Sequence, residues 1–199
     1  MFTLEDIADS VIRCRLCPLH ATRNHAVPGE GSAHSGIVLL GEGPGYHEDQ
    51  QGRPFVGASG NLLNELIMSN NLKRSDLFIT NIVKCRPPSN RDPSSSEIAT
   101  CSSHLNHQLS VIKPSVIMTL GRHALSNFFP NELISKVRGT VRQSAHGYTI
   151  LPTYHPAAIL RNPSLRPTIE QDFKTLVEIA NQVHQDDDTP ESRQLSMFS

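Results

Sequence analysis

Residues 36–45 read GIVLLGEGPG, a short, continuous apolar run that ends in a glycine-rich turn. A run of this kind is typical of a strand that is buried on both faces of a sheet. Three further stretches repeat the pattern, at residues 77–83, 115–121 and 148–152. Because strands buried on both faces occur mainly in parallel sheets, we expect these four to lie side by side in one.

Helical stretches separate these runs, at residues 58–71, 96–112, 122–129 and 168–183. Strands that alternate with helices favour a parallel sheet covered on both faces. The sequence therefore predicts an α/β fold, a three-layer α/β/α sandwich around a central, mainly parallel four-stranded sheet.

The unusual residues of the chain follow the predicted strands. They are the turn at residues 41–45, the segment 81–85, the triplet Gly121, Arg122 and His123, and residues 154–156. In parallel α/β sheets the ligand binds beyond the carboxyl ends of the strands. We therefore expect the functional site at this edge.

Composition and charge exclude several classes of protein. The chain has 199 residues with 37% hydrophobic residues, enough for one compact domain. Its 18 basic and 19 acidic residues nearly balance, so any nucleic acid must be bound through local basic patches. The N-terminus MFTLEDIADS lacks the features of a secretory signal, and no apolar run is long enough to span a membrane. We expect a cytoplasmic protein.

The four cysteines are Cys14, Cys17, Cys85 and Cys101. They are too few for a disulfide scaffold, and thiols in a reducing compartment are available for metal. The plain alternative is a set of incidental buried thiols. The Cys14–Cys17 pair is close, whereas Cys85 and Cys101 are widely spaced, which suits an iron–sulfur cluster at least as well as zinc.

Four side chains at the strand ends could form a pocket for a planar molecule. Phe55 offers an aromatic ring, Asn81 an amide, His155 an imidazole and Glu42 a carboxylate. Phe55 could equally belong to the core. Neither dinucleotide nor phosphate-loop glycine motifs are present, so a nucleotide cofactor is not expected. A base flipped out of a nucleic acid would suit such a pocket.

Four motifs then resemble one known family. They are GEGPG at 41–45, GRPFVG at 52–57, ITNIVKCRPP at 79–88 and YHPAAILRNP at 154–163. Together with the four cysteines they resemble the uracil-DNA glycosylase superfamily, and within it family 4, the iron–sulfur-containing uracil-DNA glycosylases. The likeness runs from about Cys14 to Arg161 in the right order.

The resemblance implies a DNA repair enzyme that flips uracil out of single- or double-stranded DNA and hydrolyses its N-glycosidic bond. Phe55 would stack on the uracil, Asn81 would hydrogen-bond its Watson–Crick edge, and His155 would donate to O2. The four cysteines would hold a structural 4Fe–4S cluster. Residues 157–161 would enter the minor groove.

The motifs offer more than one candidate for the residue that activates water. Other branches of the superfamily carry an aspartate where this chain has Gly43, which would line the substrate. Glu42 is therefore the first candidate for positioning the water, and Glu48 and Asp49 are the next candidates. The tyrosine that excludes thymine elsewhere in the superfamily falls at Gly45 here, one position before Tyr46.

Basic residues near these motifs predict phosphate contacts. The predicted DNA-binding residues are Lys84, Arg86, Arg138, Leu160 and Arg161. We expect the protein to act as a monomer.

The domain is expected to span residues 1–183, and the acidic, polar composition from His184 predicts a disordered tail over 184–199. The tail ends in Gln194, Leu195, Met197 and Phe198, which resemble the short peptide that docks bacterial repair proteins on the replication sliding clamp.

Two other functions stay open at the level of sequence. One is a non-catalytic, iron–sulfur DNA-binding module that senses lesions, because the superfamily's aspartate is missing at Gly43. The other is a glycosylase with a broader range of deaminated bases.

Overall fold

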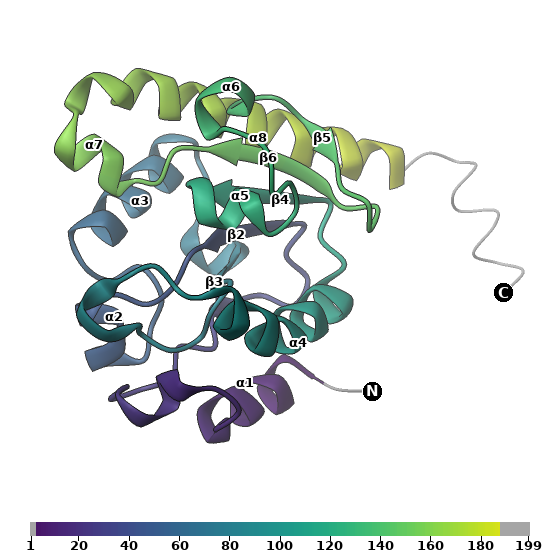
Figure 1. Cartoon of the computed structure of the whole chain (residues 1–199). Coiled ribbons are helices and arrows are strands. Elements are labelled where there is room, and N and C mark those ends of the chain that lie inside the picture. The colour runs from purple at the N-terminus through teal and green to yellow at the C-terminus, as the bar shows by residue number, and fades with distance from the viewer. Residues whose placement is uncertain (1–2, 188–199) are drawn as a thin grey trace, which may run out of the picture.

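The computed structural model describes residues 3–187, with side chains through residue 182. Its centre is a six-stranded sheet with the strand order β1-β3-β2-β4-β6-β5 (Figure 1). The strands are β1 (Glu30–Gly31), β2 (Ile37–Gly41), β3 (Phe78–Asn81), β4 (Val116–Leu120), β5 (Arg142–Gln143) and β6 (Thr149–Thr153). The neighbours among β3, β2, β4 and β6 pair in parallel, as predicted.

Two strands were not predicted. The short strands β1 and β5 pair antiparallel with β3 and β6 at the two edges of the sheet. Each has only two residues, too few to carry a hydrophobic pattern. The prediction of four strands is therefore right for the parallel centre and wrong for the edges.

Helices cover both faces of the sheet. One face carries α3 (Ala58–Ser69) and α8 (Arg166–Asp187), and the other carries α4 (Ser95–Ile112) and α5 (Arg122–Ser126), with α1 (Leu4–Arg13) outermost. The shorter helices are α2 (Tyr46–Gln51), α6 (Ile134–Val137), α7 (Ala157–Arg161), η1 (Pro18–Ala21), η2 (Arg74–Asp76), η3 (Pro88–Asn90) and η4 (Pro163–Leu165). The three-layer prediction is confirmed.

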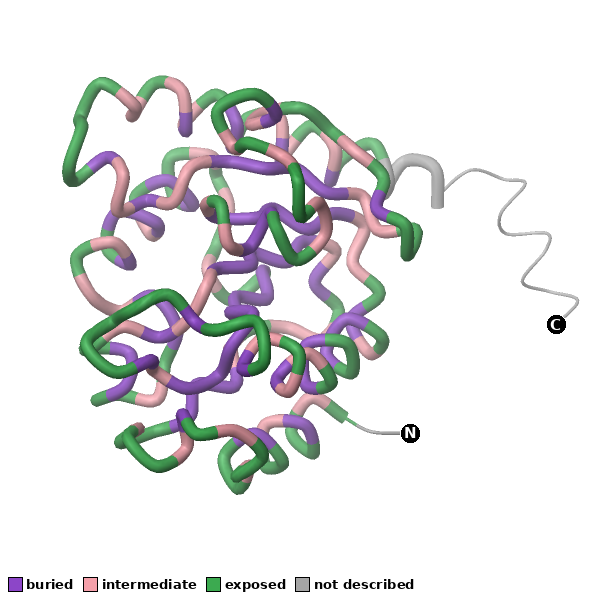
Figure 2. The backbone as a smooth tube through the Cα atoms, in the orientation of Figure 1, coloured by how far each residue is buried: buried purple, intermediate pink, exposed green. Residues whose placement is uncertain are grey.

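The alternation of side chains along the strands produces two separate cores. Leu39 and Met118 pack with α3 and α8, whereas Val38 and Ile117 pack with α1 and α4. All five residues of β2 are buried, as they are in β4 (Figure 2). Burial on both faces is the reason these strands appear in the sequence as continuous apolar runs.

The helix ends differ slightly from the predicted ones. Ser94 and Glu97 form a capping box that starts α4 at Ser95. Helix α8 begins at Arg166 and continues to Asp187, so the first residues of the predicted tail are helical. The predicted clamp-binding peptide, Gln194 to Phe198, lies outside the described residues.

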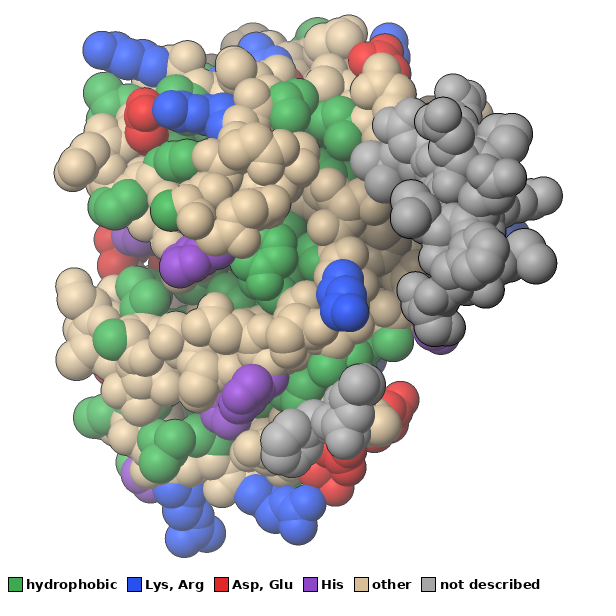
Figure 3. Space-filling model, turned by 90° about the vertical axis from the view of Figure 1, so that its right-hand side faces the viewer, with side chains coloured by type: hydrophobic (Ala, Val, Ile, Leu, Met, Phe, Trp, Pro, Cys, Tyr) green, Lys and Arg blue, Asp and Glu red, His purple; other side chains and the backbone are tan. Residues whose placement is uncertain are grey.

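Two further properties of the described residues are their helix hydropathy and the distribution of their charged side chains. None of the described helices has the length and hydropathy needed to cross a bilayer. Figure 3 shows the side that lies to the right in Figure 1, away from α7, where the Lys and Arg side chains of the described residues form separate small groups. A continuous basic surface is therefore not seen on this side.

Candidate active site

A cavity of about 410 Å³ lies at the carboxyl edge of the parallel strands. Glu42 follows β2, Asn81 ends β3, and His155 comes two residues after β6. The lining of this cavity includes every residue predicted to bind or act on the substrate, namely Glu42, Gly43, Phe55, Asn81 and His155. The topology thus brings the four motifs to one place.

Phe55 is held in an unusual backbone conformation. Its φ angle is 50°, in the left-handed region that an aromatic residue rarely adopts, and its side chain is buried. A Cβ atom at Gly60 would lie 2.0 Å from the carbonyl oxygen of Phe55, so only glycine allows α3 to approach this loop. Backbone strain of this kind concentrates at functional sites.

Glu48 and Asp49 hold the loops around the cavity. The Glu48 carboxylate accepts hydrogen bonds from the backbone N–H groups of Gly45, Val56 and Gly57. The fully buried Asp49 carboxylate accepts bonds from the backbone N–H and side-chain amide of Asn24. Because these bonds fix backbone, both carboxylates serve the structure of the loops.

Asn81 presents an unsatisfied acceptor. The side chain is 2% exposed, and its Oδ1 has no hydrogen-bond partner among the described residues. A Cβ atom at Gly41 would lie 2.3 Å from this Oδ1 and 2.6 Å from Cζ of Phe55, so the glycine keeps the space in front of both groups open. A buried acceptor without a partner is costly, which indicates that a ligand N–H pairs with it.

His155 is set up as a neutral donor. Its Nδ1 accepts a hydrogen bond of 3.1 Å from the backbone N–H of Ala157. Burial, assisted by the positive charge of Arg161, lowers the pKa of His155 to about 4. The imidazole is therefore uncharged near neutral pH, and its proton is on Nε2, which is left to donate to a ligand.

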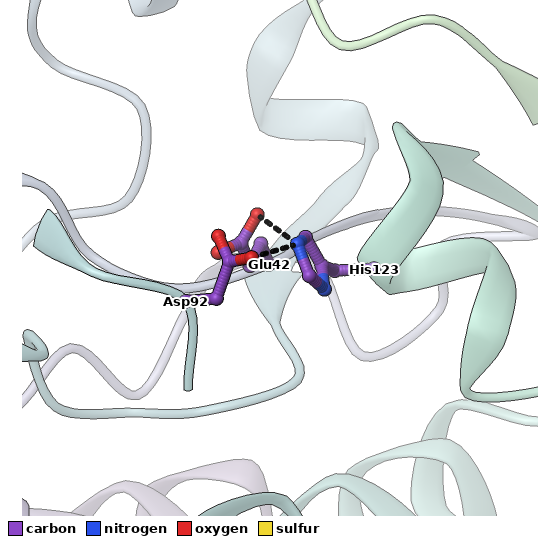
Figure 4. A group of neighbouring side chains, drawn as sticks. All are labelled: Glu42, Asp92 and His123. Carbon is purple, nitrogen blue, oxygen red and sulfur yellow. Dashed lines mark ion pairs between the residues drawn. The ribbon is translucent and has the colours of Figure 1, made fainter. Parts of the chain in front are cut away.

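Glu42 faces a histidine from the neighbouring strand end. Its carboxylate lies 3.7 Å from Nε2 of His123, which is also 3.2 Å from a carboxylate oxygen of Asp92 (Figure 4). Burial raises the pKa of Glu42, and the facing His123 opposes that rise. Glu42 lines both the main cavity and a second one that contains His123 and His155.

Tyr46 does not point into the cavity. Tyr46 is 53% exposed, and Cζ of Arg86 lies over its ring, 5.2 Å from the ring centroid. Gly45 lines the cavity instead, and a Cβ atom there would come within 2.8 Å of the Glu48 carboxylate.

Two of the predicted DNA-binding residues are paired inside the protein, and for Lys84 the prediction is wrong. Lys84 is 1% exposed, and its ammonium donates to Thr80 Oγ1, Asn81 O and Gln108 Oε1. The guanidinium of Arg138 is engaged by the buried carboxylate of Asp172. Lys84 is therefore not available to a phosphate, whereas Arg138 is partly exposed and paired with Asp172.

The other predicted contacts lie at the surface. Leu160 is 54% exposed, and Arg161 is exposed and lines the cavity. Both belong to α7, which follows β6 at the carboxyl edge (Figure 1). Arg86 donates to Asn90 Oδ1 and lies over Tyr46.

The four cysteines line one small cavity between α1, α4 and the segment after β3. Arg23 donates to Sγ of Cys85 over 2.9 Å, and none of the four forms a disulfide. Among the described residues, no three of these sulfurs all lie within 4.8 Å of one another. Sulfurs bound to one tetrahedral zinc would be about 3.8 Å apart, so this arrangement is wider than a zinc site.

The sequence did not identify every residue of the site. His123 was noted at the end of a strand without a role. Arg91 was noted with Asn90 after the third motif and as one of the basic residues near the site, whereas Asp92 and Ser59 were not singled out. Arg91 is paired with the carboxylate of Glu97. Only the position of Asp92 beside the Asn90–Arg91 pair could have drawn attention to it.

Comparisons with known proteins agree with this geometry. The family model of the uracil DNA glycosylase superfamily matches residues 28–181. A type-4 uracil-DNA glycosylase of Saccharolobus solfataricus is 49% identical over 187 residues, covering 89% of this chain and 87% of the relative. One from Archaeoglobus fulgidus is 44% identical, covering 90% and 94%. A type-5 uracil-DNA glycosylase of Thermus thermophilus is 29% identical, covering 76% and 85%.

Proposed function

Since this chain belongs to the uracil-DNA glycosylase superfamily, we propose that it removes uracil from DNA by hydrolysing the N-glycosidic bond, leaving an abasic site. The observation that carries this function is the buried, unpartnered Oδ1 of Asn81 in a cavity beside Phe55 and His155. An enzyme that acts on a base must take it out of the stack into such a pocket.

Asn81 supplies the specificity. Its Oδ1 accepts the N3–H of uracil and its amide N–H donates to O4. Cytosine reverses the donor and the acceptor at these positions, so it would leave buried groups unpaired. Sites that depend on hydrogen bonds discriminate strongly for this reason.

His155 and Phe55 act on the ring itself. Breaking the bond to C1′ leaves negative charge on uracil, and the Nε2–H of neutral His155 stabilises it at O2. Removing one donor of this kind costs roughly 10²–10³ in rate. Phe55 stacks on the base and keeps its edge aligned with Asn81 and His155.

Glu42 positions the attacking water. It is the carboxylate of the cavity that does not fix backbone, in contrast to Glu48. Gly43 lines the cavity without a side chain, at the position where other branches carry aspartate.

The cysteines fit a 4Fe–4S cluster held by Cys14, Cys17, Cys85 and Cys101. Support comes from the all-thiolate donor set around one cavity and from separations too wide for a single zinc ion. When bound, the cluster contributes structural cross-linking of the N-terminal segment to the segment after β3. Its test is iron content and visible absorbance of the purified protein, both lost in Cys101→Ser.

Arg161 and Arg86 contact DNA phosphates, while Leu160 fills the space left by the flipped base. The exposure of Leu160 next to the cavity supports this placement. We further propose that the enzyme is a cytoplasmic monomer acting on single- or double-stranded DNA.

We propose that the end of the chain, Gln194 to Phe198, binds a bacterial sliding clamp. Deletion of residues 194–199 is expected to abolish clamp binding in a pull-down and to leave uracil excision on short oligonucleotides unchanged. Clamp binding by the deletion variant would contradict the proposal.

The decisive experiment measures free base released from single- and double-stranded oligonucleotides that contain uracil. Wild type is expected to release uracil and leave an alkali-labile site, and Asn81→Ala and His155→Ala are expected to be severely impaired. Binding without release would instead indicate a lesion sensor. Comparable release of other deaminated bases would indicate a broader enzyme.

A further inference from the structure

Three side chains from separate segments converge beside the cavity. Glu42 follows β2, His123 lies in α5 after β4, and Asp92 lies between η3 and α4 (Figure 4). Nε2 of His123 is 3.7 Å from a Glu42 oxygen and 3.2 Å from an Asp92 oxygen. One imidazole nitrogen therefore faces two carboxylates.

The contact between them is electrostatic. Nε2 of His123 is shielded from solvent yet has no hydrogen bond of good geometry among the described residues. Arg122 anchors the same oxygen of Asp92, because its Nη2 donates to Oδ2 over 2.7 Å, and Nε2 of His123 lies 3.2 Å from that oxygen. Arg122, Asp92 and His123 are the charged or titratable groups that act on Glu42, and His155 and Arg161 line the same adjoining cavity.

The position of His123 separates it from substrate. It lines the adjoining cavity but not the main one, whereas Glu42 lines both. Glu42, His155 and Arg161 line both cavities, and of these three Glu42 is the one that forms an ion pair with His123.

We propose that His123, held by Asp92, is a positioning residue that aims the Glu42 carboxylate at the attacking water. The inference rests on the proposed function and adds two residues that act on the proposed catalytic carboxylate. Asp92 fixes the imidazole, and the imidazole fixes the carboxylate.

The reaction balances through this arrangement. The bond from C1′ to N1 breaks, and its electron pair leaves with uracil. The water oxygen bonds to C1′ while Glu42 takes the water proton. The proton then passes to solvent and the uracil anion takes one up, so water and nucleotide give uracil and an abasic sugar.

A double-mutant cycle tests the coupling on the full-length protein. Glu42→Gln is expected to slow single-turnover uracil release roughly 100-fold, and His123→Ala roughly tenfold. Because His123 acts through Glu42, the double variant is expected to be no slower than Glu42→Gln alone. His146→Gln, an exposed histidine in the turn between β5 and β6, is the matched control and should match wild type.

The pH profile gives a second readout that a packing role would not change. His123 lowers the pKa of Glu42 and so opposes the rise that burial causes, and removing His123 should raise the pKa of Glu42 further. In His123→Gln, which retains a polar side chain, the acid limb of the single-turnover rate should move to higher pH. The melting temperature and visible absorbance should stay those of wild type.

Each other outcome has a distinct meaning. Additive losses in the cycle, or wild-type rates in both His123 variants, overturn the inference and leave the proposed function intact. A wild-type rate in Glu42→Gln removes Glu42 and His123 together from the mechanism, whereas no release by wild type refutes the proposed function itself. Loss of activity in chelator with recovery on added Mn²⁺ would identify the three residues as cation ligands and overturn the inference.

Discussion

The rings of Phe55 and His155 lie nearly parallel, with their centroids 5.6 Å apart and their planes 26° apart. A base between two rings would need a separation of about 7 Å, twice the contact distance of carbon atoms. The base therefore cannot lie between them. We therefore expect the base to stack on the other face of Phe55, with His155 at the edge of the base.

Replacing Phe55 by leucine should preserve the apolar volume and remove the stacking surface. Stacking of a base on an aromatic ring contributes about 1–3 kcal/mol, so excision should fall roughly 5- to 150-fold. Single-turnover rates at several enzyme concentrations measure this. Phe128→Leu, which alters a ring packed on Tyr148 away from the cavity, should keep the wild-type rate.

Asn81→Ala is expected to abolish activity without lowering stability. The Oδ1 proposed to bind uracil is buried and has no partner among the described residues, and removing such an atom relieves a cost of about 1–3 kcal/mol. The melting temperature should therefore equal or exceed that of wild type while uracil release is lost. A clear drop in melting temperature would show that the amide has a structural partner.

The low pKa of His155 predicts how both excision and the free energy of unfolding depend on pH. Because the active imidazole is neutral, excision should not decline as pH rises through 6.5, the ordinary value for histidine. The folded state resists protonation, so the unfolded chain binds the extra proton between pH 6.5 and about 4. The free energy of unfolding should thus fall as pH decreases across this window, and fall less in His155→Gln. Denaturant titrations at several pH values check this.

Lys84→Met and Arg161→Ala should change different properties of the protein, namely stability in the first variant and DNA binding in the second. The first leaves buried acceptors such as Gln108 Oε1 without their donor, so stability should drop by about 1–3 kcal/mol. Lys174→Met, an exposed lysine on α8, is the control.

Arg161→Ala should instead weaken DNA binding and reduce the slope of log K against log salt by about 0.7–0.9, the value of one phosphate contact. Fluorescence anisotropy at several salt concentrations measures the slope. An unchanged slope would place Arg161 away from the phosphates, and a slope altered by Lys84→Met would contradict the buried position of that lysine.

The parallel centre of the fold could be predicted because each of its strands is buried on both faces. Residues 37–41 show this as an unbroken apolar run. The edge strands could not, since Glu30–Gly31 pairs with β3 through backbone bonds that any residues can make. The end of α8 was misplaced because polar composition alone does not end a helix.

The sequence by itself determined which residues stand at the carboxyl ends of the strands, because the hydrophobic pattern marks where each buried strand ends. Glu42, Asn81 and His155 were identified on that basis, together with the four cysteines. Tertiary structure alone decided what each charge faces. Lys84 and Arg161 are both cations in the matching motifs, yet one is buried among oxygen acceptors and the other is exposed. Burial and pairing depend on segments distant in the chain, which a local pattern does not contain.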